Sequence, residues 1–292
     1  MATNKDLKHK IDELKKEYDS LRQGKEALLD VVFEAELPES VYNSNAIENS
    51  TLTIAETEKI LLDLEVSRDV SVREVFEAKN LARVFEYIKD KVSIRNVDKE
   101  LILFLHKMLI SNINEDIAGR FRAKGEYVRV GTHVAPAPEH LESMLDAALV
   151  EYSANHKSYF LEKVSLFHLN FEHIHPFNDG NGRIGRVLIN YQLLQQGFPP
   201  IIIRDKEKQT YYKSFGEFRD KRKSTTLDNV LASALLESLH KRVTYMKGEK
   251  IVRLSDYAKK HDLSSSILLN KAKRQTIPAF REKGVWKIGE GF

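Results

Sequence analysis

The sequence predicts a mainly α-helical protein with one small β-hairpin and a separate C-terminal module. In most of the chain, apolar side chains recur at steps of three and four, which is the period of a helix with one buried face. Residues typical of strands gather around residues 127–134 and again near the C-terminus, where Lys247-Gly-Glu-Lys250 reads as a linker. The hairpin and the tail are therefore expected to be attached to a helical body.

The composition limits the class of protein. A chain of 292 residues suffices for one large domain or two unequal ones. The absence of cysteine excludes disulfides and agrees with a reducing compartment. The charged start and the lack of a long apolar run predict a cytoplasmic protein without a membrane partner. The net charge of +3 conceals a basic tail, because residues 241–292 carry 13 Lys/Arg against 5 Asp/Glu.

The first predicted element is a long amphipathic helix over residues 7–28. Its apolar residues recur at alternating steps of four and three, and Lys25 occupies one position of this apolar stripe. The apolar residues are Leu7, Ile11, Leu14, Tyr18, Leu21 and Leu28. Such a helix either packs on the body or pairs in a short coiled coil. A homodimer therefore stays open as an alternative.

Three scaffold helices are predicted next. Thr53-Ile-Ala-Glu56 is a capping box that begins a helix through Leu61 and Leu64. A second helix spans Glu74 to Val92, and Asp98 caps a third that runs through Leu101–Leu109. After these, Tyr127–Val130 favours a strand, Gly131 a turn and Thr132–Val134 a second strand.

The chemistry-bearing stretch is His175–Arg186, which lies between two amphipathic helices. Periodic apolar residues lead to His175 from Val164 and continue from Ile184 until Gly197 and Pro199 end the pattern. His168, on the first of these helices, is predicted to be a hydrogen-bonded support for the loop. The stretch is thus a helix, a tight polar loop and a second helix.

The loop combines the groups that bind phosphate. Gly180, Asn181 and Gly182 lie where the second helix begins, and such an end attracts anions and admits them close to the backbone. Arg183 and Arg186 add guanidinium groups that suit phosphate oxygens. Asp179 would repel phosphate unless a divalent cation such as Mg²⁺ lay between them, and a neutral His175 could accept a proton from a hydroxyl.

The same stretch resembles the signature of the Fic family, His-x-Phe-x-Asp/Glu-Gly-Asn-Gly-Arg-x-x-Arg, at every fixed position. The resemblance implies a Fic-type helical bundle that transfers AMP from ATP to a hydroxyl side chain of a target protein, which can be the protein itself. It implies that His175 is the general base, Asp179 the Mg²⁺ ligand, and Asn181 with the N–H groups of Gly180 and Gly182 the phosphate cradle. Arg183 and Arg186 would bind the outer phosphates, and Phe177 would anchor the loop.

Two further segments resemble parts of this family. Ser44-Asn-Ala-Ile-Glu48-Asn49 fits the inhibitory motif Ser/Thr-x-x-x-Glu-Gly/Asn, which implies that Glu48 pairs with Arg186 in place of the γ-phosphate. The hairpin residues Thr132, His133 and Val134 correspond to a flap that holds the target segment by backbone pairing. An ordinary hairpin that caps the core is the alternative.

The region after the signature carries less information. Tyr211 and Tyr212 lie either near the nucleotide base, as the resemblance implies, or in the core, and they precede an amphipathic stretch through Phe218. Another helix is predicted over Leu227–Leu239.

The tail loosely resembles a winged helix-turn-helix. Short helices are predicted at Leu254–Ala258 and Ile267–Arg274, and strands at 277–280 and 284–288 could form a wing. Asn270, Lys271, Lys273 and Arg274 would face DNA if the module binds it. The module could instead dock protein targets or carry a solvated basic face, and the sequence leaves these three interpretations open.

The predicted organisation is N-terminal helices with the inhibitory segment over residues 1–65, a Fic domain over 66–246 and the winged-helix-like module over 251–292. The predicted function is autoinhibited, Mg-ATP-dependent protein adenylylation. Three alternatives remain: removal of AMP by water that Glu48 positions, nucleotide sensing by a DNA-binding regulator, and transfer of another phosphate-containing group.

Overall fold

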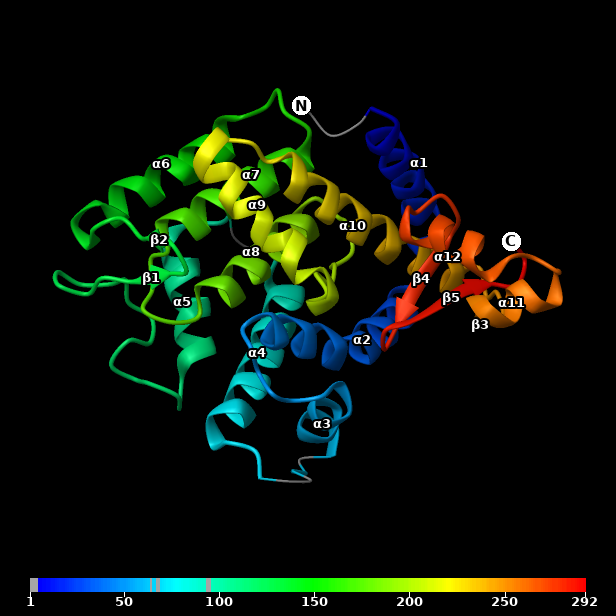
Figure 1. Cartoon of the computed structure of the whole chain (residues 1–292), viewed down its shortest axis with the longest axis horizontal. Helices are drawn as coiled ribbons and strands as arrows, with labels where there is room; N and C mark the ends of the chain where they lie inside the picture. Colours follow the sequence, from blue (N-terminus) through cyan, green and yellow to red (C-terminus); the bar gives the residue numbers. More distant parts are fainter. Residues whose placement is uncertain (1–4, 64, 67–68, 93–95) are drawn as a thin grey trace.

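The computed structural model consists of a helical body, built from α1 to α10, and a small C-terminal module beside it (Figure 1). It describes residues 5–292 except 64, 67, 68 and 93–95. The first half of the body contains α1 (Lys5–Arg22), α2 (Glu26–Ile47), α3 (Ile54–Glu58), the π-helical turn η1 (Lys59–Asp63), α4 (Val72–Lys91) and α5 (Lys99–Ile110).

The second half of the body begins with the hairpin and contains the signature helices. Its elements are β1 (Arg129–Val130), β2 (His133–Val134), the 3₁₀ turn η2 (Pro138–His140), α6 (Leu141–Ala154), α7 (Phe160–Ile174), α8 (Asn181–Gln195), the 3₁₀ turn η3 (Asp205–Glu207), α9 (Lys208–Lys221) and α10 (Thr225–Met246). The hairpin is antiparallel, with Arg129 opposite Val134 and Val130 opposite His133. The predicted strands thus pair as expected, although they are shorter than predicted.

The prediction of one helix over residues 7–28 is wrong, because the chain turns between α1 and α2. Gly24 adopts φ 72°, a left-handed conformation that glycine tolerates and that ends α1. α1 lies along α10 and buries Ile11 and Tyr18 against the body. The apolar face of α1 is therefore covered within the chain, and the homodimer remains untested.

The scaffold helices begin where their capping residues predict. Thr53 and Glu56 form the capping box of α3, and the Asp98 carboxylate accepts a 2.7 Å hydrogen bond from the Leu101 N–H. α4 starts at Val72, slightly before the predicted Glu74, because Ser71 caps it. Leu64 lies outside the described residues. Helix α6 was not predicted, since residues 141–154 follow a proline-rich segment without a clear starting signal.

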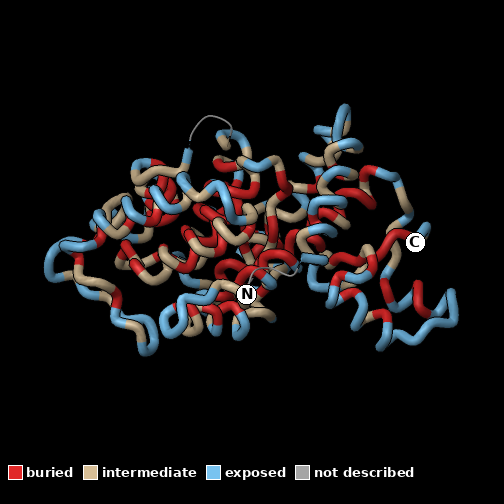
Figure 2. Tube along the Cα trace, turned by 90° about the horizontal axis from the view of Figure 1, so that it is seen from above, coloured by how far each residue is buried: buried red, intermediate tan, exposed pale blue. Residues whose placement is uncertain are grey.

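Helix α8 is the centre of the body. It is buried over most of its length, because α2, α4, α5 and α7 pack against it. Figure 2 shows that the buried parts of the chain, in red, gather in the interior of the molecule. A helix enclosed in this way holds the groups at its N-terminus in fixed positions. Among the described residues, none of the helices is both long enough and apolar enough to span a bilayer.

The C-terminal module contains β3 (Ile251–Arg253), α11 (Leu254–Lys260), α12 (Ser265–Lys273), β4 (Ala279–Glu282) and β5 (Val285–Gly289). The strands form an antiparallel sheet in the order β3-β5-β4. The module has its own apolar cluster, which includes Leu254, Leu268 and Ile288. The two helices and the hairpin lie close to their predicted positions, and β3 adds a strand that the sequence did not indicate.

Candidate active site

His175 lies at the turn that ends α7. Its backbone adopts φ 50°, and its N–H donates a 2.8 Å hydrogen bond to the Phe171 carbonyl. A left-handed conformation is costly for a non-glycine residue and persists only where the surroundings impose it. The turn directs the imidazole into a pocket where only 13% of the side chain is exposed.

Buried Arg122 fixes this turn from outside the signature. Its guanidinium donates to the carbonyls of His175 (2.9 Å), Glu126 (2.8 Å) and Pro136 (2.9 Å), and its own N–H donates to Pro176. Arg122 therefore ties the segments that flank the hairpin to the loop. Sequence reasoning missed it because it lies in an irregular segment, where no periodicity distinguishes a buried arginine from a solvated one.

The loop after His175 is closed by Asn181 and His106. The Asn181 side-chain amide accepts from the Phe177 N–H (2.9 Å) and donates to the Phe177 carbonyl (2.8 Å). His106 stacks on Phe177 at a centroid distance of 3.7 Å, and its Nε2 lies 3.0 Å from the Asp179 carbonyl oxygen. Since its Nδ1 accepts from the Gly119 N–H, Nε2 carries the proton and donates it. No sequence pattern predicted this role of His106.

Two glycines allow the close packing at the start of α8. Gly180 adopts φ 80° as the N-cap residue, beside Leu109 and Ile110. A Cβ on Gly182 would come within 2.2 Å of the Glu48 carboxylate and 3.0 Å of the Arg186 guanidinium. The first N–H groups of α8 have no acceptor within the helix, so the space above Gly182 suits an anion.

The two signature arginines have different partners. Arg183 contacts Glu77 on α4 at 3.2 Å and Asp179 at 3.1 Å. Arg186 is also buried and donates from Nε to the Ser44 hydroxyl (2.9 Å) and from Nη2 to the Ser44 carbonyl (2.8 Å). Nη2 also donates to the Glu48 carboxylate (2.9 Å), whereas Nη1 has no hydrogen-bond partner among the described residues.

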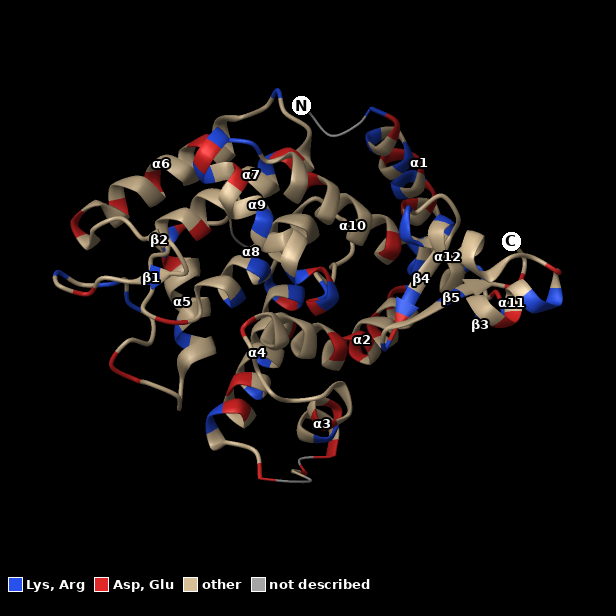
Figure 3. Ribbon diagram, in the orientation of Figure 1, with Lys and Arg blue, Asp and Glu red and all other residues tan. Residues whose placement is uncertain are grey.

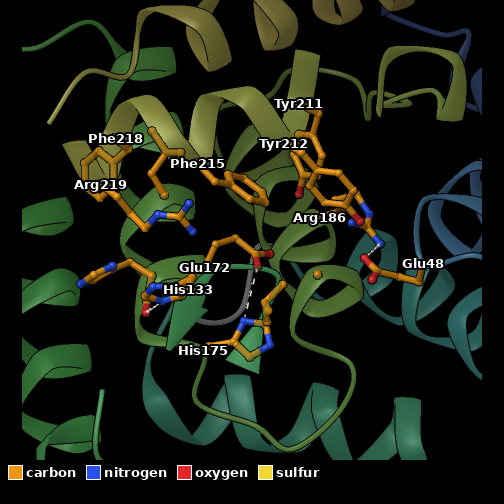
Figure 4. A pocket seen from close by; sticks show the side chains of 14 residues that line it. Glu48, His133, Glu172, His175, Arg186, Tyr211, Tyr212, Phe215, Phe218 and Arg219 are labelled. Atoms are coloured by element: carbon orange, nitrogen blue, oxygen red, sulfur yellow. Dashed lines mark hydrogen bonds and ion pairs between the residues drawn. The ribbon is translucent and has the colours of Figure 1, made fainter. Parts of the chain in front are cut away.

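The segment predicted to be inhibitory therefore lies against Arg186 in this structure. α2 ends at Ile47, Glu48 is its C-cap residue, and 37% of the Glu48 side chain is exposed at the edge of the pocket (Figure 4). Asn49 follows at φ 69° and accepts a 2.7 Å hydrogen bond from Lys208. The Tyr212 hydroxyl donates to the Ile47 carbonyl at 2.9 Å, which further holds the end of α2.

Asp179 lies at the outer side of the loop. One carboxylate oxygen accepts from the Gly180 N–H (2.6 Å) and from Arg183 (3.1 Å), while the other pairs with Arg73 on α4. Burial favours the neutral acid, but Arg183 and Arg73 outweigh it and lower the Asp179 pKa. The carboxylate is thus ionised and partly exposed, as a divalent cation requires.

The remaining pocket wall is largely aromatic (Figure 4). Tyr211 is fully buried, and its hydroxyl lies 2.7 Å from Nε2 of His168. His168 is thus buried and hydrogen-bonded to α9, whereas its predicted support of the loop stays a prediction. Tyr211 and Tyr212 both line the pocket and are also packed in the core, so the two interpretations of this pair are compatible. On the hairpin, His133 lies 2.8 Å from the His173 carbonyl, whereas Thr132 and Val134 are exposed.

Burial shifts the pKa values of two titratable groups in the pocket, His175 and Glu172. Burial lowers the His175 pKa to about 4, so the imidazole is neutral at physiological pH and can accept a proton. Burial and the nearby Glu48 raise the Glu172 pKa to about 8. One Glu172 oxygen lies 3.8 Å from Nδ1 of His175, and the other has no hydrogen-bond partner among the described residues. Sequence reasoning did not single out Glu172.

The raised pKa of Glu172 predicts a pH-dependent stability. Between pH 4.5 and about 8 the folded protein retains a proton that the unfolded chain releases, so stability falls as the pH rises through this range. Glu172→Gln, which cannot ionise, is expected to raise the melting temperature by a few degrees at pH 8 and by less at pH 5. Thermal melts of both proteins across this range test the prediction. An equal difference at all pH values would show that Glu172 does not titrate there.

The arrangement defines a class of site: a helix-loop-helix anion cradle with a neutral histidine at one side and a carboxylate at the other. The same region of the chain matches a known family. A family model described as "Fic/DOC family" matches residues 96–193, which include α7, the loop and most of α8. The chain therefore carries a Fic/DOC-family domain.

Two named relatives are similar over a longer region. "Protein adenylyltransferase Fic" of Nematostella vectensis is 30% identical over 214 residues, which are 72% of this chain and 49% of that protein. The protein of the same name from Aedes aegypti is 32% identical over 178 residues, 59% of this chain and 35% of that protein. The chain thus spans half or less of the length of these relatives.

Solved structures share the fold. A Fic domain-containing signalling protein from Bacteroides thetaiotaomicron has a TM-score of 0.71 at 25% identity, covering 82% of this chain and 98% of that one. Fic-1 from C. elegans has a TM-score of 0.70 at 22% identity, covering 81% of this chain and 71% of the other. The likeness to both includes regions outside the 96–193 match.

Proposed function

We propose that the protein is an autoinhibited adenylyltransferase that transfers AMP from Mg-ATP to a hydroxyl side chain of a target protein. The observation that carries this proposal is the position of the neutral His175 imidazole beside the start of α8, in the same pocket as Arg186 and Glu48. The names of the relatives support the same reaction.

In the proposed reaction, the target hydroxyl oxygen attacks the α-phosphorus of ATP. A bond forms between this oxygen and the α-phosphorus, the bond from the α-phosphorus to the bridging oxygen breaks, and pyrophosphate leaves. His175 accepts the hydroxyl proton, for which a neutral imidazole is required. The N–H groups at the start of α8 stabilise the charge that develops on the phosphoryl oxygens.

The two arginines contribute differently in this proposal. Arg183 is already paired with Glu77 and Asp179, so it organises the loop as well as adding positive charge. Arg186 has one unpartnered donor group among the described residues and is otherwise held by Ser44 and Glu48. Displacement of Glu48 would free a second donor and complete a bidentate site for the terminal phosphate.

The residues fit a divalent cation at Asp179. Its carboxylate is ionised and a third of it is exposed, and the group that covers it, Arg73, is itself more than half exposed and can move aside. A Mg²⁺ held there would neutralise phosphate charge. A single carboxylate suffices, since nucleotide oxygens and water complete the usual coordination.

Asp179→Asn is expected to lower AMP incorporation by roughly 100-fold, because the cation contributes several kcal/mol of charge stabilisation. If the substitution weakens only the binding of Mg²⁺, the loss of AMP incorporation should diminish at high Mg²⁺ concentration. Incorporation is measured against Mg²⁺ concentration in the Glu48→Gly background, with Asp220→Asn on the exposed face of α9 as the charge-matched control. An unchanged Mg²⁺ dependence would show that another group holds the cation.

The donor is tested with two labels. Incorporation from α-labelled ATP without incorporation from γ-labelled ATP would identify AMP transfer, and the reverse result would identify phosphate transfer. Self-labelling of the Glu48→Gly protein can replace an unknown target. ATP binding without transfer from either label would favour the nucleotide sensor, whose DNA contact would involve the basic α12.

Removal of AMP is a second candidate, because Glu48 lines the same pocket as His175 and could orient water there. This activity predicts that the wild-type protein releases AMP from a labelled target and that Glu48→Gly does not. Glu48 would then be catalytic as well as inhibitory.

A further inference from the structure

We infer that the turn between β4 and β5 clamps the inhibitory helix α2 and thereby positions Glu48 against Arg186. This inference rests on the proposed autoinhibition and assigns part of that regulation to the C-terminal module. The contact joins the tip of the hairpin to residues on α2 and α3 of the body (Figure 1).

The turn forms a small anion-binding concavity. Lys283 and Gly284 adopt φ 48° and 77°, as in a two-residue hairpin turn, and they connect the paired residues Glu282 and Val285. Consecutive N–H groups in this conformation converge on one acceptor. Here they donate to the Glu39 carboxylate at 2.9 Å and 3.1 Å.

Glu39 is a buried carboxylate on α2 with only 4% of the residue exposed. Apart from the two turn N–H groups, its carboxylate pairs with Arg204, which also donates to Glu237 at 2.7 Å. Arg281 of β4 donates to the same Glu237 at 2.6 Å. Loss of the turn would leave this buried carboxylate with Arg204 as its remaining charged partner, and a buried charge that loses hydrogen bonds is favoured to move toward water.

A second set of ion pairs lies beside the first. Glu36 of α2 contacts Lys241 of α10 at 3.1 Å, and Lys241 contacts Glu282 of β4 at the same distance. Lys283 itself contacts Glu58 of α3 at 2.7 Å. Figure 3 shows the acidic side of α2 facing the basic end of β4. The hairpin thus holds α2 through charges as well as through the turn.

The clamp lies on the part of α2 that carries the inhibitory residues. Glu48 follows Glu39 by nine positions, a distance of about 13.5 Å at 1.5 Å per residue. Pro38, immediately before Glu39, lacks the N–H that would bond to the preceding turn. The segment from Pro38 to Ile47 is therefore less firmly held by the first half of α2. Contacts with the body hold it instead: Glu39 with the β4–β5 turn at one end, the Asp205 N–H donating to Asn43 in the middle, and Arg186 at the other end.

The test compares the rate of hydrogen exchange at residues 40–48 between the wild-type full chain and variants of it. Glu39→Gln retains size and helix propensity but loses the charge, and exchange is expected to become about 10- to 100-fold faster, the change expected for losing charge-assisted hydrogen bonds. Lys283→Pro acts from the other side, since proline has no N–H and cannot adopt φ 48°. Glu34→Gln, at an exposed position of the same helix, is the matched control and should exchange like wild type.

Two further readouts separate the possible failures. The single tryptophan, Trp286, lies on β5 opposite Arg281, so its emission reports whether the hairpin stays folded. The clamp would be overturned if residues 40–48 exchanged hydrogen at the wild-type rate in Glu39→Gln and also in Lys283→Pro. In the second variant, altered Trp286 emission would confirm that the hairpin had been disturbed. Faster hydrogen exchange at residues 40–48 in both variants would support the clamp. If neither these variants nor Glu48→Gly incorporated AMP, adenylyl transfer would be rejected while the clamp would stand.

Discussion

Replacing Glu48 with glycine is expected to raise AMP incorporation by roughly 100-fold, because removal of a charge-assisted hydrogen bond to Arg186 frees about 2 to 3 kcal/mol for phosphate binding. In the structure, the Glu48 carboxylate accepts a hydrogen bond from Nη2 of Arg186 and lies over Gly182, where an anion would approach. Glycine is tolerated at a helix C-terminus, so the end of α2 should survive the change. Incorporation of α-labelled ATP with Mg²⁺ measures the effect.

Glu48→Gln provides an informative comparison, since the amide retains the volume and loses the negative charge. An intermediate rise is expected, because bulk still obstructs the site while Arg186 is freed from the ion pair. Equal incorporation by wild type and Glu48→Gly, at equal ATP affinity, would show that Glu48 does not restrain the reaction. The Arg186 contact would then be structural.

Replacing His175 with alanine in the Glu48→Gly background is expected to reduce AMP incorporation by about 1,000-fold, within the range that a positioned general base supplies. The imidazole is held in the pocket by a left-handed turn and by Arg122, and burial keeps it neutral. No other histidine that lines the pocket belongs to the loop, because His133 lies on the hairpin and His173 on α7. A bound solvent molecule would be a much weaker base.

The control for this loss is His140→Ala, which removes an exposed histidine at the end of η2. ATP affinity should be little changed in the His175→Ala protein, since the phosphate contacts come from α8 and its loop. Calorimetric titration with ATP separates lost binding from lost chemistry. Persistent labelling without His175 would assign the base to another group, and Glu172 would be the first candidate because it lies 3.8 Å from His175.

The candidate loop was predictable because its features are local. Helices α3 and α5 begin directly after their capping residues, and the helices on both sides of the loop follow a repeat of three and four residues. The glycines at 180 and 182 likewise have a local meaning, since the chain must turn and leave room above the start of α8. Each of these signals involves residues that lie within about ten positions of one another in the sequence.

Buried polar residues far from the loop were not predictable. Arg122 and His106 lie 53 and 73 residues before the carbonyl groups that they hold. Neither stands in a pattern that distinguishes a buried polar side chain from an exposed one. The break at Gly24 was missed for a related reason, because an isolated glycine interrupts a helix only when the following segment packs in another direction.

By itself, the sequence determined the helical class, the order of most of the main elements and the polar groups that lie within the His175–Arg186 stretch. Family resemblance added the pairing of Glu48 with Arg186, which are 138 residues apart. Only the tertiary structure decided the pKa values of His175 and Glu172 and the contact between the β4–β5 turn and Glu39, across 244 residues. Periodicity and capping depend on neighbouring residues, whereas burial and long-range ion pairs depend on how whole helices pack.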